Sequence, residues 1–122
     1  MSSPFAQCGD YKVVHMFAGS GGCTAGFDED GFETIAAVDN DADACADLDY
    51  LLNRAVAVTA NIMKMEPADL RQICGPRRPD VYVCTPPCKG WSRLLDKKKR
   101  KSPKYVEMCS LAVRAVWLGM YA

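Results

Sequence analysis

A cysteine that follows two prolines is the residue of this chain best placed for covalent chemistry. Residues 81–84 are apolar and predict a short buried strand, and Thr85-Pro86-Pro87 must end it, because proline offers no amide to a ladder and fixes φ. Cys88 is therefore expected on a rigid turn past the carboxyl end of that strand, where ligands bind open α/β sheets. Lys89 and Arg93 are close in sequence, and nearby cations favour the nucleophilic thiolate. An inert buried thiol is the alternative interpretation.

A glycine-rich turn and an acidic residue twenty positions later form a second candidate site. Gly19, Gly21 and Gly22 follow an expected strand, where glycine lets the backbone approach a ligand and the amides of a helix start favour an anion. Asp39 ends the next expected strand, where a carboxylate can accept hydrogen bonds from both ribose hydroxyls of an adenosine moiety. Spacing alone leaves a dinucleotide site open, although Thr24 replaces the third glycine of Gly-x-Gly-x-x-Gly. The alternative role for Asp39 is a helix N-cap.

Alternating strands and helices must position these residues. Apolar, β-branched runs predict strands at 12–17, 34–38, 55–59 and 81–84, whereas helices are predicted at 24–30, 42–52, 66–74 and 105–120. Gly31 is expected to end the first helix, and the last helix carries an apolar stripe at positions 109, 113, 116 and 120. Residues 1–10 show no clear period and predict a loose arm. The alternation predicts an α/β fold with a parallel sheet and flanking helices.

Length and composition set limits on the class of protein. The 122 residues suffice for one domain with a core but not for two. The seven cysteines are scattered without a Cys-x-x-Cys pair, and His15, the only histidine, sits in an apolar strand. Free thiols in a reducing compartment are therefore expected, and no metal site. There is no apolar run of membrane-spanning length and no signal pattern, which predicts an intracellular protein: cytoplasmic in a prokaryote or virus, nuclear in a eukaryote.

The formal net charge of zero conceals a segregation of charge. Residues 28–53 contain acids but neither lysine nor arginine, whereas residues 89–104 contain eight bases and one acid. The basic segment follows Cys88 directly. A polyanionic substrate approaching that side of the molecule would suit this arrangement.

These motifs together resemble those of the cytosine-5 DNA methyltransferase family. Pro87-Cys88-Lys89-Gly90-Trp91-Ser92 is similar to the family's catalytic pattern of Pro-Cys, a variable residue, Gly or Ala, an aromatic and Ser. Phe17-Ala18-Gly19-Ser20-Gly21-Gly22 resembles the Phe-x-Gly-x-Gly-Gly motif with which the family holds S-adenosylmethionine. The two motifs and Asp39 occur in the family's order. The resemblance implies a Rossmann-like, S-adenosylmethionine-dependent methyltransferase fold with a truncated parallel sheet and flanking helices.

The resemblance also implies which residues hold the cofactor. Asp39 matches the acidic ribose-binding position and Asn40 the neighbour that packs on the adenine. Asn61 stands where the family usually has an aspartate that accepts from the adenine amino group, and its uncharged bond would be weaker. The expected cofactor residues are Phe17, Ala18, Gly19, Ser20, Gly21, Gly22, Asp39, Asn40, Asn61, Ile62 and Pro86.

The reaction implied by the resemblance is covalent. The Cys88 thiolate would add to carbon 6 of a cytosine in DNA, so that carbon 5 can take the methyl group, and the base must be flipped out of the duplex. Adjacent parallel strands are expected to bring Gly19 and Cys88 to one edge. The basic segment would contact phosphates, the alternatives being a solvated loop or a nuclear-import signal. The residues expected to contact nucleic acid are Lys89, Ser92, Arg93, Lys97, Lys98, Lys99, Arg100 and Lys101.

The resemblance covers residues 12–120 and only the first part of a family catalytic domain. The family's later Glu-Asn-Val segment, whose glutamate protonates the cytosine ring, does not occur in the sequence. Residues 1–122 are thus expected to form a single partial catalytic domain: a fragment, one half of a split enzyme, or a non-catalytic module that binds S-adenosylmethionine or nucleic acid. The same chemistry on RNA is also open. An incomplete sheet favours a complementing chain or self-association.

Overall fold

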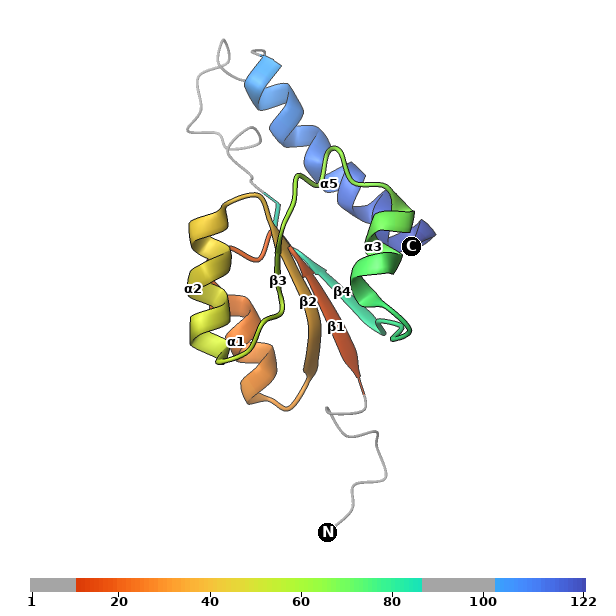
Figure 1. The fold of residues 1–122 in the computed structure, drawn as a ribbon. Helices are drawn as coiled ribbons and strands as arrows, with labels where there is room; N and C mark the ends of the chain where they lie inside the picture. Colours follow the sequence, from red (N-terminus) through yellow and green to blue (C-terminus); the bar gives the residue numbers. More distant parts are fainter. Residues whose placement is uncertain (1–10, 87–102) are drawn as a thin grey trace.

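A four-stranded parallel sheet is the centre of the described structure, a computed structural model that covers residues 11–86 and 103–122, with only the backbone described for residues 104–109. Strands and helices alternate along the chain, as the sequence predicted, and all strand pairs are parallel (Figure 1). The elements are β1 (Lys12–Met16), α1 (Gly22–Glu29), β2 (Glu33–Asp39), α2 (Ala42–Leu52), β3 (Ala57–Thr59), α3 (Pro67–Cys74), β4 (Val81–Cys84) and α5 (Pro103–Tyr121).

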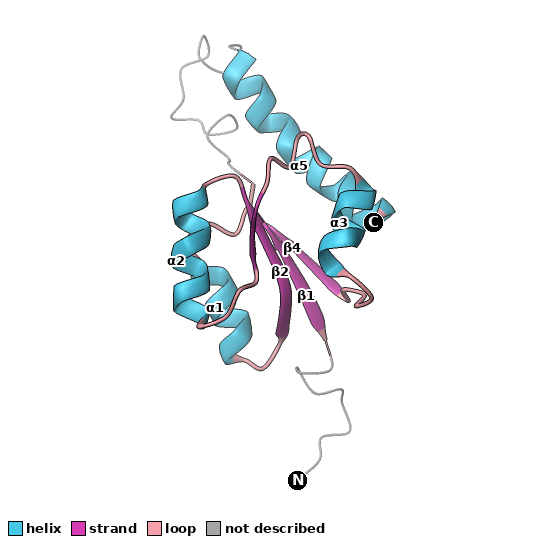
Figure 2. Cartoon of the chain, viewed as in Figure 1, coloured by secondary structure: helices cyan, strands magenta, loops and turns pink. Residues whose placement is uncertain are grey.

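The strand order is β3-β2-β1-β4, so β1 is central and β4 is its neighbour on the side away from β2. Val13 of β1 is paired with Thr34 of β2 and with Val81 of β4. Helices α1 and α2 cover one face of the sheet, whereas α3 and α5 lie on the other (Figure 2). Because all four strands run in the same direction, the segments that follow them meet at one edge of the sheet.

The larger apolar core lies between the sheet and the layer of α3 and α5. Alternate residues of β1 contribute to it, as the period of two in a strand requires. Strand β2 contributes the consecutive residues Ile35 and Ala36, because its register with β1 shifts at this point. The loop after β3 adds two side chains, and α3 and α5 add four. The buried members of this core are Val14, Met16, Ile35, Ala36, Val38, Ile62, Met65, Leu70, Cys74, Ala115 and Leu118.

Short polar contacts set the start of α3 and of β3. The Glu66 amide donates to Asp69 Oδ2 at 2.9 Å, which satisfies a backbone group at the start of α3. Asp49 Oδ1 of α2 accepts from the amides of Val56 and Ala57 at 2.9 and 2.8 Å. The third strand therefore begins at Ala57, two residues later than the sequence predicted.

The apolar stripe of α5 does not face the sheet. Ala115 and Leu118 are fully buried, whereas Val113, Val116 and Met120 are 71%, 58% and 72% exposed. Apolar residues occur on both faces of this helix, so a period of 3.6 residues could not tell which face packs inward. Three residues of the stripe, Val113, Val116 and Met120, are therefore exposed on the surface of α5.

Burial of His15 predicts that the stability of the sheet depends on pH. The residue is 1% exposed, its ring meets Phe27 edge-on with centroids 5.2 Å apart, and its Nε2 has no hydrogen-bond partner in the described ranges. Burial lowers the pKa of His15, and the nearby Asp28 carboxylate opposes this only in part. The unfolded chain, with an ordinary histidine pKa of about 6.5, therefore binds more protons than the folded chain.

We expect the free energy of unfolding to fall as the pH drops from 7.5 through about 6.5 and towards the lowered folded pKa. Urea denaturation at pH 7.5, 6.5 and 5.5 measures this change. The matched variant His15→Phe, which keeps an aromatic ring against Phe27 but does not titrate, should lose this component. An identical pH dependence in the two proteins would contradict the assignment.

Candidate active site

The predicted cofactor residues gather at the carboxyl edge of the sheet. The glycine-rich turn at 17–22 follows β1, Asp39 ends β2, Asn61 follows β3 and Pro86 follows β4. The central position of β1 places the turn between β2 and β4. Four segments that are distant in sequence thus share one edge.

The glycines of the turn have different structural roles. Gly19 has φ +59°, and a Cβ atom added there would meet no atom within 4 Å, so this part of the turn is open to a ligand. Gly21 has φ +100°, and its Cβ would lie 2.9 Å from Leu48 Cγ of α2. Gly21 therefore permits the turn to pack against α2, whereas Gly19 leaves an accessible backbone.

Hydrogen bonds to both neighbouring strands fix the turn. The Ala18 amide donates to the Val38 carbonyl at 3.1 Å, and the Gly19 amide donates to Asp39 Oδ2 at 2.9 Å. On the other side, Thr85 Oγ1 donates to the Phe17 carbonyl at 2.9 Å. The turn is thus held in place by protein contacts alone.

The start of α1 can receive an anion. Gly21 precedes the helix and no side chain caps it, and the first turn contains no acidic residue. The first intrahelical bond at this end runs from the Ala25 amide to the Gly21 carbonyl at 2.8 Å. The amides of Gly22, Cys23 and Thr24 precede that bond, so they are available to a carboxylate or a similar group.

Asp39 connects the turn to the start of α2. Its Oδ2 accepts from Gly19, and its Oδ1 accepts from the Asp41 amide at 2.9 Å. The interpretation of Asp39 as the N-cap of α2 is wrong, because Asp41 caps that helix by accepting from the amides of Asp43 and Ala44 at 2.9 and 3.2 Å. Each carboxylate oxygen has two lone pairs, so Asp39 retains capacity for the two hydroxyls of a ribose.

The residues that follow β2 and β3 differ in their exposure and in their hydrogen bonds. Asn40 is exposed, which leaves it accessible to a ligand. Asn61 is exposed too, but its Oδ1 accepts from the Met63 amide at 3.0 Å. The Ile62 side chain is 3% exposed and belongs to the core, so a ligand at this edge would meet the backbone of Ile62.

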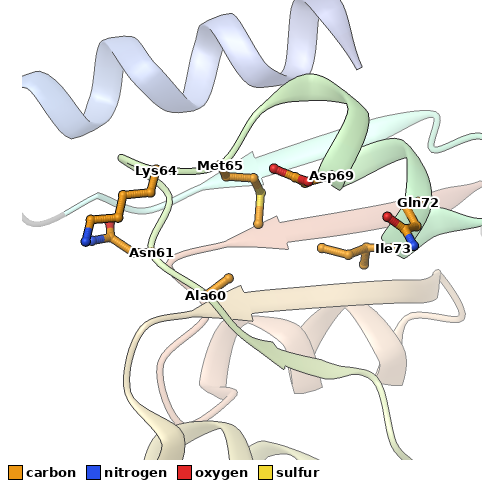
Figure 3. A pocket seen from close by; sticks show the side chains of 7 residues that line it. All are labelled: Ala60, Asn61, Lys64, Met65, Asp69, Gln72 and Ile73. Carbon is orange, nitrogen blue, oxygen red and sulfur yellow. The ribbon is translucent and has the colours of Figure 1, made fainter.

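A hollow of about 530 Å³ lies beside Asn61, between the loop after β3 and helix α3. Figure 3 shows Asn61 and Lys64 on one side of it, and Asp69, Gln72 and Ile73 of α3 on the other. Asp39 and the glycine-rich turn do not line it, so the hollow is separate from the turn and shares only Asn61 with the predicted cofactor residues. Its lining residues are Ala60, Asn61, Lys64, Met65, Asp69, Gln72 and Ile73.

The predicted nucleophile and the predicted nucleic-acid contacts lie outside the described residues. Cys88, Lys89, Ser92, Arg93, Lys97, Lys98, Lys99, Arg100 and Lys101 all fall between 87 and 102. Pro86, just past β4, is half-buried. Burial raises the pKa of the Cys84 thiol at the end of β4, which disfavours a thiolate at that position.

Two further observations concern metal ions and membranes. Among residues 11–86 and 103–122 there is no cluster of three side chains suited to hold a metal ion. Within those same ranges no helix is long and apolar enough to cross a membrane.

Thr85 and Asp41 were not identified from the sequence. The hydroxyl of Thr85 reaches a carbonyl 68 residues earlier, and such a partner cannot be found without the strand order. Asp41 offered a local signal, because an aspartate directly before an alanine- and leucine-rich run is a typical N-cap.

Comparisons with known proteins agree with this architecture. The sequence model of the C-5 cytosine-specific DNA methylase family matches residues 11–114. The Type II methyltransferase M.XorII of Xanthomonas oryzae pv. oryzae is 33% identical over 81 residues, which are 65% of this chain and 19% of that protein. M.AgeI of Thalassovita gelatinovora is 34% identical over 83 residues, 66% of this chain and 19% of that protein. The chain thus spans about a fifth of the length of these two relatives.

Solved structures support the fold. The S. pombe Dnmt2 methyltransferase matches with a TM-score of 0.57 and 15% identity, over 88% of this chain and 30% of that one. A mutant of Spodoptera frugiperda DNMT2 matches with a TM-score of 0.53 and 22% identity, over 79% of this chain and 30% of that one. At these identities the likeness concerns the fold alone.

Proposed function

Because the chain belongs to the C-5 cytosine-specific DNA methylase family, we propose that it forms the cofactor-binding and nucleophile-bearing part of an enzyme that methylates carbon 5 of cytosine in DNA. The observation that carries the proposal is the bond from the Gly19 amide to Asp39 Oδ2, which joins the open glycine turn to the acidic end of β2. Residues 1–122 are, in this proposal, one partial catalytic domain.

S-adenosylmethionine is the cofactor proposed for this edge, and it supplies an electrophilic methyl group. The free amides at the start of α1 suit its carboxylate, and Asp39 suits its ribose hydroxyls. The lack of a side chain at Gly19 leaves room for the ligand to approach the backbone. Asn40, Asn61 and Pro86 border the same edge and are proposed to surround the adenine.

Cys88 is the proposed nucleophile. Its thiolate adds to carbon 6 of a flipped cytosine, and carbon 5 then becomes nucleophilic enough to take the methyl group. Loss of the proton from carbon 5 and of the thiolate from carbon 6 restores the aromatic ring. The bases between Lys89 and Lys101 are proposed to neutralise phosphates of the nucleic acid around the target.

Calorimetric titration of the chain with S-adenosylmethionine tests the cofactor half of the proposal. We expect saturable binding with one site per chain. A chain that is folded by circular dichroism but does not bind would contradict the proposal that these residues form a cofactor site by themselves.

A non-catalytic module that binds S-adenosylmethionine or nucleic acid is the second candidate. The observation in its favour is Asn61, whose oxygen already accepts from Met63 and carries no charge to strengthen a bond to the adenine. RNA as the nucleic acid is a variant of either candidate.

We further propose that a complementing chain or a second copy of this chain covers the β4 side of the molecule. In the described ranges β4 is paired only with β1, and the strand carries no charged residue that would discourage pairing. Gly119 of α5 faces Tyr82 of β4, and Arg114 lies on another flank of the helix, bonded to the carbonyls of Ile62 and Met65. Val113, Val116 and Met120, the exposed residues of the α5 stripe, lie next to Gly119 on the surface of the helix, on the side away from Arg114.

The α5 stripe and the open edge of β4 together predict self-association of the isolated chain or association with a complementing chain. We expect the mass measured by light scattering to rise with protein concentration. Val116→Glu should lower it at each concentration, because pairing would bury an unpaired charge. A monomer at high concentration in both proteins would contradict self-association.

A further inference from the structure

Thr85 connects the turn after β4 to the turn after β1. Its Oγ1 donates to the Phe17 carbonyl at 2.9 Å, and its amide donates to the Met16 carbonyl at 3.3 Å. The side-chain bond spans 68 positions of the sequence. One residue next to Pro86 thus holds the first residue of the glycine-rich turn.

Phe17 is the strained residue of that turn. Its φ of 61° is in the left-handed region, which a bulky side chain rarely adopts. Conformations of this kind persist only where surrounding contacts hold them, and they concentrate at ligand sites. The Phe17 carbonyl and the Ala18 amide belong to one planar peptide group, which the Thr85 hydroxyl holds at its oxygen and the Val38 carbonyl holds at its N–H. The bond from the Gly19 amide to Asp39 acts one peptide group later, so Thr85 supplies the side-chain contact to the peptide group that follows Phe17.

We infer that Thr85 is a positioning residue for the cofactor turn: its hydroxyl holds Phe17 in the left-handed conformation and so keeps the following turn in its binding shape. The inference rests on the proposed function for its ligand, S-adenosylmethionine. If only part of the population has the binding shape, the apparent dissociation constant rises by the inverse of that fraction. Loss of the hydroxyl should therefore weaken binding although Thr85 need not touch the ligand.

The test compares Thr85→Val, which keeps the shape of the side chain but removes the hydroxyl, with Thr85→Ser, which keeps the hydroxyl. Because the bond is exposed, its loss should raise the dissociation constant for S-adenosylmethionine by about three- to tenfold in Thr85→Val. Thr85→Ser should bind within about twofold of the unmodified chain. Calorimetric titration measures all three proteins.

Hydrogen exchange of single amides, measured by NMR without ligand, gives a second readout. In Thr85→Val the amides of Ala18 and Gly19 should exchange faster, and the Cys45 amide, bonded to Asp41 in α2, should keep its rate. Unchanged exchange at Ala18 and Gly19 together with unchanged affinity would overturn the inference and leave the proposed function intact. If the unmodified chain does not bind the cofactor, the proposed cofactor site fails, and the exchange rates decide the role of Thr85 on their own.

Discussion

Replacing Asp39 with alanine is expected to weaken S-adenosylmethionine binding by at least about a hundredfold, because two hydrogen bonds to a charged acceptor are lost. The change also removes the acceptor that holds the Gly19 amide, so the turn becomes less well ordered for the ligand. Calorimetric titration of the variant beside the unmodified chain measures the loss. A dissociation constant within threefold of the original would remove Asp39 from the proposed site.

Asp41→Ala is the matched control for that experiment. Asp41 lies two residues away and caps α2, and its side chain accepts from Asp43 and Ala44 rather than from the glycine turn. We expect the control to lower the free energy of unfolding by about 1 kcal/mol, the usual cost of a lost N-cap, with little change in cofactor affinity. Equal losses of affinity in both variants would indicate that a general loosening of this edge explains the Asp39 result.

Cys88→Ser is expected to abolish the covalent complex with DNA that contains 5-fluorocytosine. Fluorine at carbon 5 cannot leave as a proton does, so the adduct of the thiolate at carbon 6 should persist after methyl transfer and be visible by denaturing electrophoresis. Methyl transfer to ordinary DNA should fall at least about a thousandfold in the variant, as when other enzymes lose their nucleophile. Both assays are carried out with the segments that complete the catalytic domain, either in a longer chain or added as a separate chain.

Cys84→Ala provides the control for Cys88. Cys84 lies four positions earlier, in β4, where burial raises the pKa of its thiol and makes it a poor nucleophile. We expect the control to form the adduct and Cys88→Ser to form none. If no adduct appears with the unmodified cysteines and a completed domain, the catalytic proposal fails and the non-catalytic module is favoured.

The sequence predicted the elements well because local signals agree along most of the chain. The β-branched run at 12–16 and the strand cut off by Thr85 have sharp boundaries, and Gly31, with φ +90°, ends the first helical segment as expected. The apolar stripe predicted a helix at 105–120, and α5 confirms it, but the pattern did not show which face of the helix packs on the sheet. The stripe at Val113 and Val116 faces outward, because α5 is apolar on more than one face.

The residues of the candidate site could be predicted where they follow a sequence motif, but not where their contacts depend on which strands are neighbours in the sheet. The glycine turn and Asp39 could be identified from their spacing, and in the structure the Gly19 amide nitrogen lies 2.9 Å from Asp39 Oδ2. The spacing did not show that Asp41, rather than Asp39, caps α2, because two aspartates compete for that position. The hydrogen bond from Thr85 to the Phe17 carbonyl could not be predicted, because it depends on β4 lying next to β1.

The strand order also determines how much chain must be closed to build each part of the site. Val13 meets Thr34, 21 residues away, when β1 pairs with β2, but it meets Val81, 68 residues away, when β1 pairs with β4. Closing the longer loop costs about 1 kcal/mol more in chain entropy. The contiguous segment from β1 to β3 can therefore assemble the glycine turn and Asp39 through short-range closures. We therefore expect the strand that leads to Cys88 to pair later, at a higher cost in chain entropy, and the bond from Thr85 to Phe17 to form at that step.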